Sequence, residues 1–198
     1  SGAVPETVIK RRRSVAEVEA HRAKARSALK VKRVGARKVQ FKRAEQYVKE
    51  FRTKERSLIH HHRIAKSTGG YYRPAEERVA LVVRIRGINN LHPKPRKTLQ
   101  LLRLRQIGNA VLLKLNKATL NMLKLVAPYV TWGYPSQKTI SDLVYKRGFA
   151  SVQGQRLPIT SNQIVEDNLG TKDILCVEDL IHELSSCGEN FRYANRFL

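Results

Sequence analysis

Residues 6–66 contain no proline and only one glycine, Gly35, and they are rich in Ala, Arg, Lys and Glu. A stretch of this composition favours helix and excludes a fold built only from sheets. We expect one helix over about 6–30, a loosening around Gly35 and a second helix over about 39–66. The second helix has a narrow apolar stripe on one face, which cannot bury a core alone and must lie against another element or a partner. Its residues are Phe41, Ala44, Val48, Phe51, Leu58 and Ile59.

The charge of the 198-residue chain is strongly positive, with 39 Lys+Arg, 16 Asp+Glu and a formal net charge of +23. It is also uneven: residues 1–78 carry 22 basic and 8 acidic side chains, residues 79–147 carry 13 and one, and residues 148–198 carry 4 and 7. A surplus of this size costs self-repulsion unless a polyanion neutralises it, so nucleic acid is the first partner to consider. We expect the polyanion to face the first two thirds of the chain.

The pattern changes after Gly69-Gly70 to alternating strands and helices. The β-branched run Val79–Ile85 predicts a buried strand. A helix is expected to begin at Thr98 as its N-cap, with an apolar face of Leu101, Leu104 and Ile107, and to end at Gly108. Further strands at 110–115 and 129–132 and a helix at 119–126 complete a β-α-β-α-β order, which is typical of a compact two-layer α+β unit.

The final third predicts short helices joined by brief extended pieces. The helices are expected over 139–147, over 162–169 with Thr160 as the cap, and over 178–186, and the extended pieces at 150–152 and 174–177. The α+β chain is thus expected to have three regions. These are a basic helical N-terminal arm over 1–78, a small core over 79–134 and an α-rich C-terminal extension over 135–198 packed on the core.

The basic side chains of the arm are candidates for phosphate contact. They surround the helix instead of occupying one face, which suits insertion between phosphate backbones and should make binding steeply salt-dependent. The alternative is a solvated charged helix, but acidic residues are too scarce for regular i,i+4 pairing. The candidates are Arg11, Arg12, Arg13, Arg22, Lys24, Arg26, Lys30, Lys32, Arg33, Arg37, Lys38, Lys42 and Arg43.

The loop over residues 88–97 is a second candidate contact. Pro93 and Pro95 stiffen it, and its cations precede the expected helix at Thr98, whose exposed N–H groups also favour phosphate. Arg84 and Arg86 alternate along the strand that leads into it. A rigid surface turn with incidental charges is the alternative. The candidates here are Arg86, His92, Lys94, Arg96, Lys97, Arg103 and Arg105.

Metal and enzyme sites lack the residues that they need. Three consecutive histidines, His60 to His62, point about 100° apart on a helix and cannot chelate one ion, so no metal is expected. His61 and Arg63 stay candidates for phosphate or base contact. Cys176 and Cys187 match no paired-cysteine zinc motif. Phosphate-loop, dinucleotide-binding, zinc-protease and serine-hydrolase motifs are absent, so we expect no enzyme, no cofactor and no small-molecule substrate.

Two other classes of partner also fit poorly. The longest apolar run, Val79–Val83, is far short of the roughly 20 residues that span a bilayer, so no membrane is expected. A DNA-binding dimer of leucine-zipper type would need clean heptads, and in a heptad reading of residues 41–62 Glu55 and His62 interrupt the seam. We therefore do not expect a homo-oligomer.

Several segments in order along the chain resemble one family of ribosomal proteins, known as L-seven in the eukaryotic large subunit and as L-thirty in bacteria. The similarity covers essentially the whole chain. The segments are Phe41–Glu45, Tyr47–Glu50, Val83–Asn89, Leu99–Ile107, Lys114–Ala118, Trp132–Pro135, Tyr145–Gly148 and Glu178–Glu183.

The resemblance implies a ferredoxin-like core, no catalytic activity and ribosomal RNA of the large subunit as partner, with neighbouring large-subunit proteins beside it. It implies RNA contact by the loop after the first strand and by the following helix, and it adds Lys117 within a matching segment to the candidates. A cytoplasmic ribosomal location with nucleolar transit is expected. A nucleolar paralogue that acts in subunit assembly is the alternative.

Overall fold

The computed structural model describes residues 4–198. The chain divides into two compact units, one ending at Gln46 and the other running from Tyr47 to Leu198. The first unit holds the greater part of one long helix, and the second holds the end of that helix and every strand of the described residues. The division into an arm, a core and an extension at residues 78 and 134 stays a prediction.

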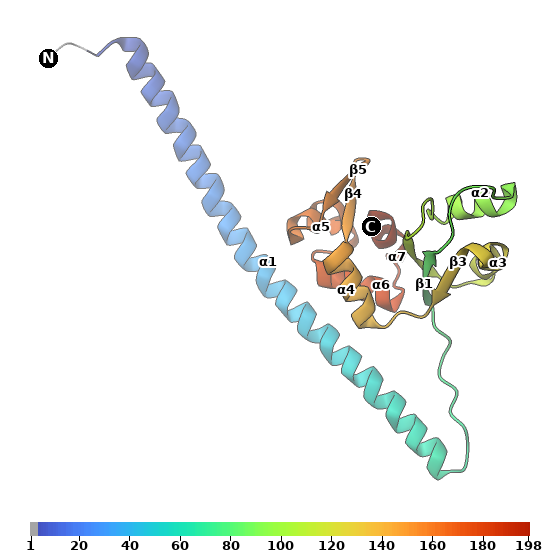
Figure 1. The fold of residues 1–198 in the computed structure, drawn as a ribbon. Helices are drawn as coiled ribbons and strands as arrows, with labels where there is room; N and C mark the ends of the chain where they lie inside the picture. Colours follow the sequence, from blue (N-terminus) through green and yellow to red (C-terminus); the bar gives the residue numbers. More distant parts are fainter. Residues whose placement is uncertain (1–3) are drawn as a thin grey trace. The chain divides into compact units, whose positions relative to one another are not determined.

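Helix α1 (Glu6–Ser67) is one uninterrupted helix of 62 residues, about 93 Å long at 1.5 Å per residue (Figure 1). The prediction of two helices with a loosening at Gly35 is therefore wrong. A glycine inside a helix costs only about 1 kcal/mol relative to alanine, and every further residue adds a backbone hydrogen bond. The helix formers on both sides of Gly35 carry the helix through it.

A three-stranded antiparallel sheet forms the centre of the second unit. Strand β1 (Val79–Arg84) lies between β2 (Ala110–Lys114) and β3 (Val130–Gly133), with Leu81 opposite Leu112 and Val82 opposite Trp132. Helix α2 (Pro93–Leu101) connects β1 to β2, and α3 (Lys117–Val126) with the 3₁₀ turn η1 (Ala127–Tyr129) connects β2 to β3. This β-α-β-α-β order confirms the predicted ferredoxin-like α+β core.

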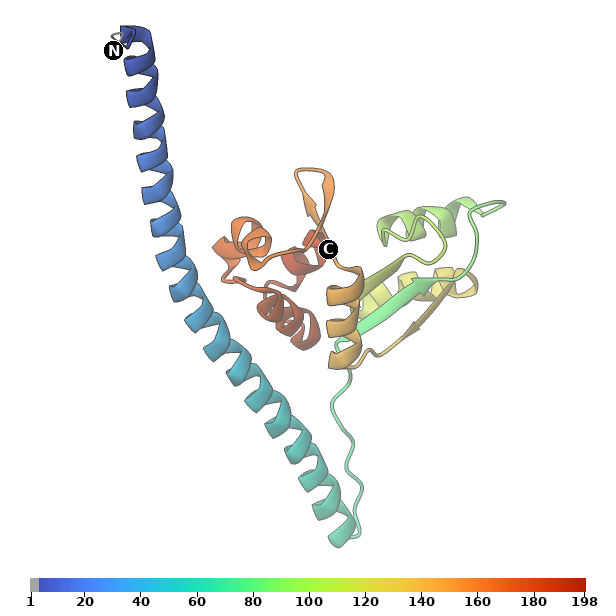
Figure 2. The ribbon, with the colours of Figure 1, turned by 60° about the vertical axis from the view of Figure 1, so that its left-hand side comes forward.

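Both faces of this sheet are covered, because side chains alternate along each strand. Val82 and Val130 point to one face, where they pack with Leu99 of α2 and Leu123 of α3. Val79 and Leu112 point to the other face and join a second cluster. Figure 2 shows the sheet with α2 and α3 on one side and the helices of the final third on the other. The sheet therefore belongs to two hydrophobic cores.

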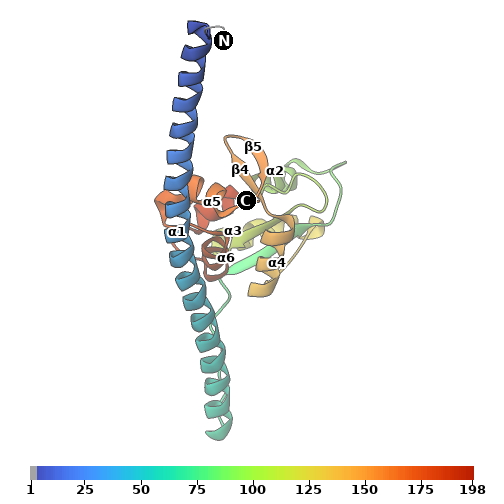
Figure 3. The same ribbon diagram turned by 90° about the vertical axis from the view of Figure 1, so that its left-hand side faces the viewer.

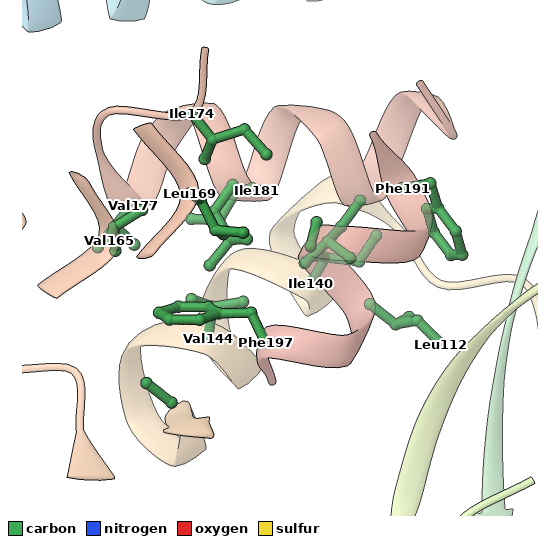
Figure 4. Packing of buried hydrophobic residues seen from close by; sticks show 14 of the residues in the cluster. Leu112, Ile140, Val144, Val165, Leu169, Ile174, Val177, Ile181, Phe191 and Phe197 are labelled. Atoms are coloured by element: carbon green, nitrogen blue, oxygen red, sulfur yellow. The ribbon is translucent and has the colours of Figure 1, made fainter. Parts of the chain in front are cut away.

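The second cluster is built mainly by helices of the final third. They are α4 (Gln137–Arg147), α5 (Asn162–Leu169), α6 (Val177–Ser186) and α7 (Phe191–Phe197). Figure 4 shows Ile140, Val165, Ile181 and Phe197 converging from these four helices, with Leu112 reaching them from the sheet. This shared core fixes α7 beside the sheet.

Helix α2 begins earlier than predicted. It starts at Pro93 with His92 as the N-cap, and Thr98 lies inside it with its hydroxyl donating to the Lys94 carbonyl at 3.0 Å. Proline suits the first helical turn, where its missing N–H needs no partner, so the Pro-rich segment is helix and not loop. The expected continuation to Ile107 is also wrong, because Arg103 has a left-handed φ of 61° that ends the helix.

The final third differs from the prediction in four places. Strand β4 (Phe149–Val152) pairs with β5 (Gln155–Pro158) in a separate two-stranded ribbon (Figure 3), and β5 was not predicted. Helix α7 was not predicted either. Residues 174–177 form no strand in the part of the chain that the structure describes, because Cys176 caps α6 and Val177 is already helical. Helix α5 has the predicted bounds, but its N-cap is Ser161 and not the predicted Thr160.

Across residues 4–198 no helix is both long and apolar enough to cross a membrane.

The last third of α1 contacts α6 through a polar aromatic side chain and not through the predicted apolar stripe. The ring of Tyr47 stacks on that of His182 at 4.0 Å, and its hydroxyl donates to Asp179 at 2.8 Å. Phe51 and Leu58 of the stripe stay exposed. Tyrosine provides both an aromatic face and a hydrogen-bond donor. The prediction selected residues by apolar character alone and therefore did not include Tyr47.

Candidate nucleic-acid interface

The arm cations lie on a helix that is largely exposed to solvent. Within α1, whose residues are all described, none is buried. Successive residues turn by about 100°, so the run Arg11–Arg13 alone spans much of the circumference. Apart from Lys32 and Arg43, which have interactions of their own, no predicted arm contact forms an ion pair within the described residues. These cations can meet phosphates without first losing an internal partner.

Arg84 is not a surface contact, although it alternates with Arg86 in the sequence. Its side chain is only 4% exposed, and its guanidinium donates to the carbonyls of Arg86 (2.8 Å), Gly87 (2.7 Å), Leu104 (2.7 Å) and Arg105 (3.0 Å). Four carbonyls from two loops thus converge on one buried cation. Arg84 fixes the loops on which the exposed cations sit.

The predicted contacts of the loop are grouped at the start of α2. His92 caps the helix by accepting from the Lys94 N–H at 3.4 Å, and Lys94, Arg96 and Lys97 all lie within its first two turns. All three cations are exposed and none forms an ion pair across residues 4–198. Arg86 lies nearby over the Tyr129 ring at 5.9 Å. The amino-terminal end of α2 therefore combines free cations with the helix dipole, which favours anions.

An open cavity of about 750 Å³ lies between this helix and the preceding loop. Arg96 and Arg105 line it together with the amide side chains of Asn89, Asn90 and Gln100. Apolar side chains complete the wall: Ile88, Leu91 and Leu99. Amides, guanidinium planes and apolar surface are the groups that recognise an unstacked RNA base and its phosphate. A prediction based on charge alone did not include the three amides, although Asn89 and Asn90 lie within the Pro-containing segment 88–97.

Arg103 and Lys117 lie apart from this cavity. The guanidinium of Arg103 donates to the backbone carbonyl of Asn195 at 2.8 Å and to its side-chain oxygen at 3.1 Å. Burial, and the nearby charge of Arg196, lower the pKa of Arg103 below its usual value. Lys117 is the first residue of α3, directly after the N-cap Asn116. The predicted contacts of the core therefore form two groups.

The histidine run behaves as a surface with aromatic partners. The ring of His61 stacks on Tyr72 with centroids 5.1 Å apart, and His62 meets the same ring edge-on. In the part of the chain that the structure describes, no three His, Cys, Asp or Glu side chains are arranged to hold a metal ion. The contacts of His61 and Arg63 with nucleic acid stay predictions.

Comparison with known proteins places these features in one family. Residues 4–75 match the family described as Ribosomal L30 N-terminal domain, and residues 80–130 match Ribosomal protein L30p/L7e. The chain is 53% identical over 195 residues to a Caenorhabditis elegans protein named large ribosomal subunit protein uL30, covering 98% of this chain and 80% of that one. Proteins of the same name from Dictyostelium discoideum and Neurospora crassa are 49% and 48% identical, each over 98% of this chain and 79% of the relative. The chain belongs to the L30p/L7e family of ribosomal proteins.

Proposed function

We propose that this chain is a structural constituent of the large ribosomal subunit, where it binds and stabilises ribosomal RNA. Its family membership supports this role, as do relatives along nearly its whole length that are named as large-subunit proteins. The observation that carries the proposal is the helix α1, which has no buried residue and is basic on all sides, in a chain whose core presents a further basic helix end.

The mechanism is phosphate neutralisation combined with shape recognition. Each Lys or Arg that meets a phosphate releases bound counterions, which supplies affinity without base specificity. The arm meets phosphates around its circumference, whereas the cavity beside α2 offers amides to a base as well. The chain acts as a single copy, without cofactor or catalysis, beside other large-subunit proteins. It works in the cytoplasmic ribosome after passing through the nucleolus during assembly.

Sedimentation of a cell extract tests this role. In sucrose gradients at low and moderately raised salt, the protein should follow large subunits, whole ribosomes and polysomes. When magnesium is chelated and the subunits separate, it should stay with the large subunit and not with the small one. Presence only in nucleolar pre-subunit particles, with none in polysomes, would contradict the proposal and favour an assembly factor.

A further inference from the structure

A second cavity, of about 460 Å³, lies on the side of the core where α7 packs. We call it the α7 pocket. Its walls bring together four cations from the end of β2, the loop after α2 and α7 itself: Arg103, Lys114, Arg192 and Arg196. One carboxylate, Glu189, lies at the same cavity. The pocket therefore gathers positive charge next to the most acidic third of the chain.

Within the part of the chain that the structure describes, these cations are not neutralised by ion pairs. Arg196 lies close enough to Arg103 for its charge to lower the pKa of that guanidinium, in addition to the effect of burial. Like charges gathered in this way repel each other, and an anion in the pocket would reverse that cost.

The other cations of the final third show how unusual Arg192 and Arg196 are. Residues 148–198 contain four basic side chains. Arg156 lies over the Phe149 ring at 3.7 Å, and Lys172 over the Tyr193 ring at 4.6 Å. Arg192 and Arg196, four residues apart on one face of α7, have no such partner within the described residues and both line the pocket.

Arg103 is held in place by Asn195. Both oxygens of Asn195 accept from its guanidinium, and the Asn195 amide donates to the Leu112 carbonyl at 2.8 Å. Arg103 also has a left-handed backbone, at a helix end where glycine is the usual residue. Arg103 thus has a long side chain at a position that disfavours one. Asn195, itself bonded to Leu112, fixes the direction of that side chain.

We infer that the α7 pocket binds a backbone phosphate of ribosomal RNA. The inference rests on the proposed function and adds a contact from the acidic third, in which sequence reasoning placed none. Three of the four cations are arginines, whose forked guanidinium matches phosphate oxygens. The pocket adjoins the surface of residues 79–147, which carry 13 basic side chains and one acidic. Such a surface suits a polyanion with regularly spaced charges better than a short acidic peptide.

The test compares two double variants of the full chain for binding to purified large-subunit ribosomal RNA over a range of salt concentrations. Arg192→Gln with Arg196→Gln removes two charges from the pocket. Arg156→Gln with Lys172→Gln removes two charges of the same acidic third that lie outside both the pocket and residues 79–147, and is the matched control. Circular dichroism and thermal melting establish that both are folded. A parallel binding measurement uses poly-glutamate as the acidic-peptide probe.

We expect the pocket variant to bind RNA more weakly, with the slope of log K against log salt smaller by about 0.7–0.9, the value for one phosphate, and the control to match the wild type. A folded pocket variant with the wild-type slope overturns the inference, and so does a loss confined to poly-glutamate binding. If the wild-type chain itself does not bind this RNA, the proposed function fails. If the wild type binds and the two variants are equal, only the pocket is ruled out.

Discussion

The part of α1 up to Gln46 and the unit that begins at Tyr47 differ in what stabilises them. Within α1, all of it described, no residue is buried, whereas the other unit buries Val82 and Leu180 completely in two separate cores. A helix surrounded by cations has no face left for a core, so within the chain its stability rests mainly on backbone propensity, and we expect a polyanion to add to it. The folded unit instead buries one arginine, Arg84, to hold a few exposed cations in fixed positions. The arm contributes many exposed charges, and the folded unit holds a few charges in fixed positions.

The largest contrast should come from leucines. Leu180→Ala removes a fully buried side chain of α6 and should lower the free energy of unfolding by about 2–5 kcal/mol. Leu29→Ala, on the exposed surface of α1, should change it by less than about 0.5 kcal/mol. Urea denaturation followed by fluorescence of Trp132 measures both. Equal effects would mean that α1 is part of a core.

The two roles of arginine can be separated next. Arg84→Met leaves four loop carbonyls without their donor and should lower the free energy of unfolding by about 1–3 kcal/mol. Arg105→Met, at the cavity beside α2, should leave stability nearly unchanged and weaken binding to large-subunit ribosomal RNA. Denaturation and RNA binding are measured on both variants. The reverse pattern would show that Arg84 contacts RNA and Arg105 holds the fold.

Gly35→Ala tests whether α1 is continuous. Since Gly35 is helical and nothing lies within 4 Å of an added Cβ, alanine should stabilise the helix by about 1 kcal/mol. The circular dichroism signal at 222 nm should then persist to higher temperature, while the unfolding of the two cores is unchanged. Loss of helicity or of RNA binding in this variant would indicate a hinge at Gly35.

The last effect is a change in the free energy of unfolding that appears only at high pH. Burial raises the pKa of the Cys176 thiol from its ordinary 9.0 to about 11, so the folded state holds this proton more tightly than the unfolded state. The resulting stability is present in full below about pH 9 and is lost as the pH rises through about 11. The free energy of unfolding should therefore fall more steeply with pH in the wild type than in Cys176→Ser. Burial and a hydrogen bond to Glu178 also raise the pKa of Tyr145 in both proteins, whereas the charge of the Cys176 thiolate raises it further only in the wild type. Identical slopes would show that Cys176 is as accessible to water in the fold as in the unfolded chain.

Local patterns predicted most of the fold. The β-branched run at Val79 became the central strand, and the bounds of α5 agree with the expectation. The errors arose where local rules compete. Gly35 is a weak breaker among strong helix formers, and Pro93 was taken as loop although it suits a first helical turn. Helix α7 was missed because its apolar residues Phe191, Ala194 and Phe197 are buried by contacts with distant parts of the chain.

The candidate interface was predictable as charge but not as position. Counting cations identified the arm and the start of α2, but it could not show that Arg84 is buried by carbonyls about 20 residues away. Nor could it show that Arg103 is held by Asn195, 92 residues further along the chain. The first pairing follows from the packing of the loop after α2 on β1, and the second from the packing of α7 beside the sheet, and no local pattern encodes either.

Hydrogen exchange with and without RNA tests most directly whether the arm depends on a polyanion. Amides of α1 up to Gln46 should exchange rapidly in the free protein, since no residue of this helix is buried, and those of β1 and α6 should exchange slowly. Addition of large-subunit ribosomal RNA should slow exchange along residues 6–46 and leave β1 and α6 nearly unchanged. Arm amides that are slow without RNA, or that stay fast when RNA is bound, would contradict the account.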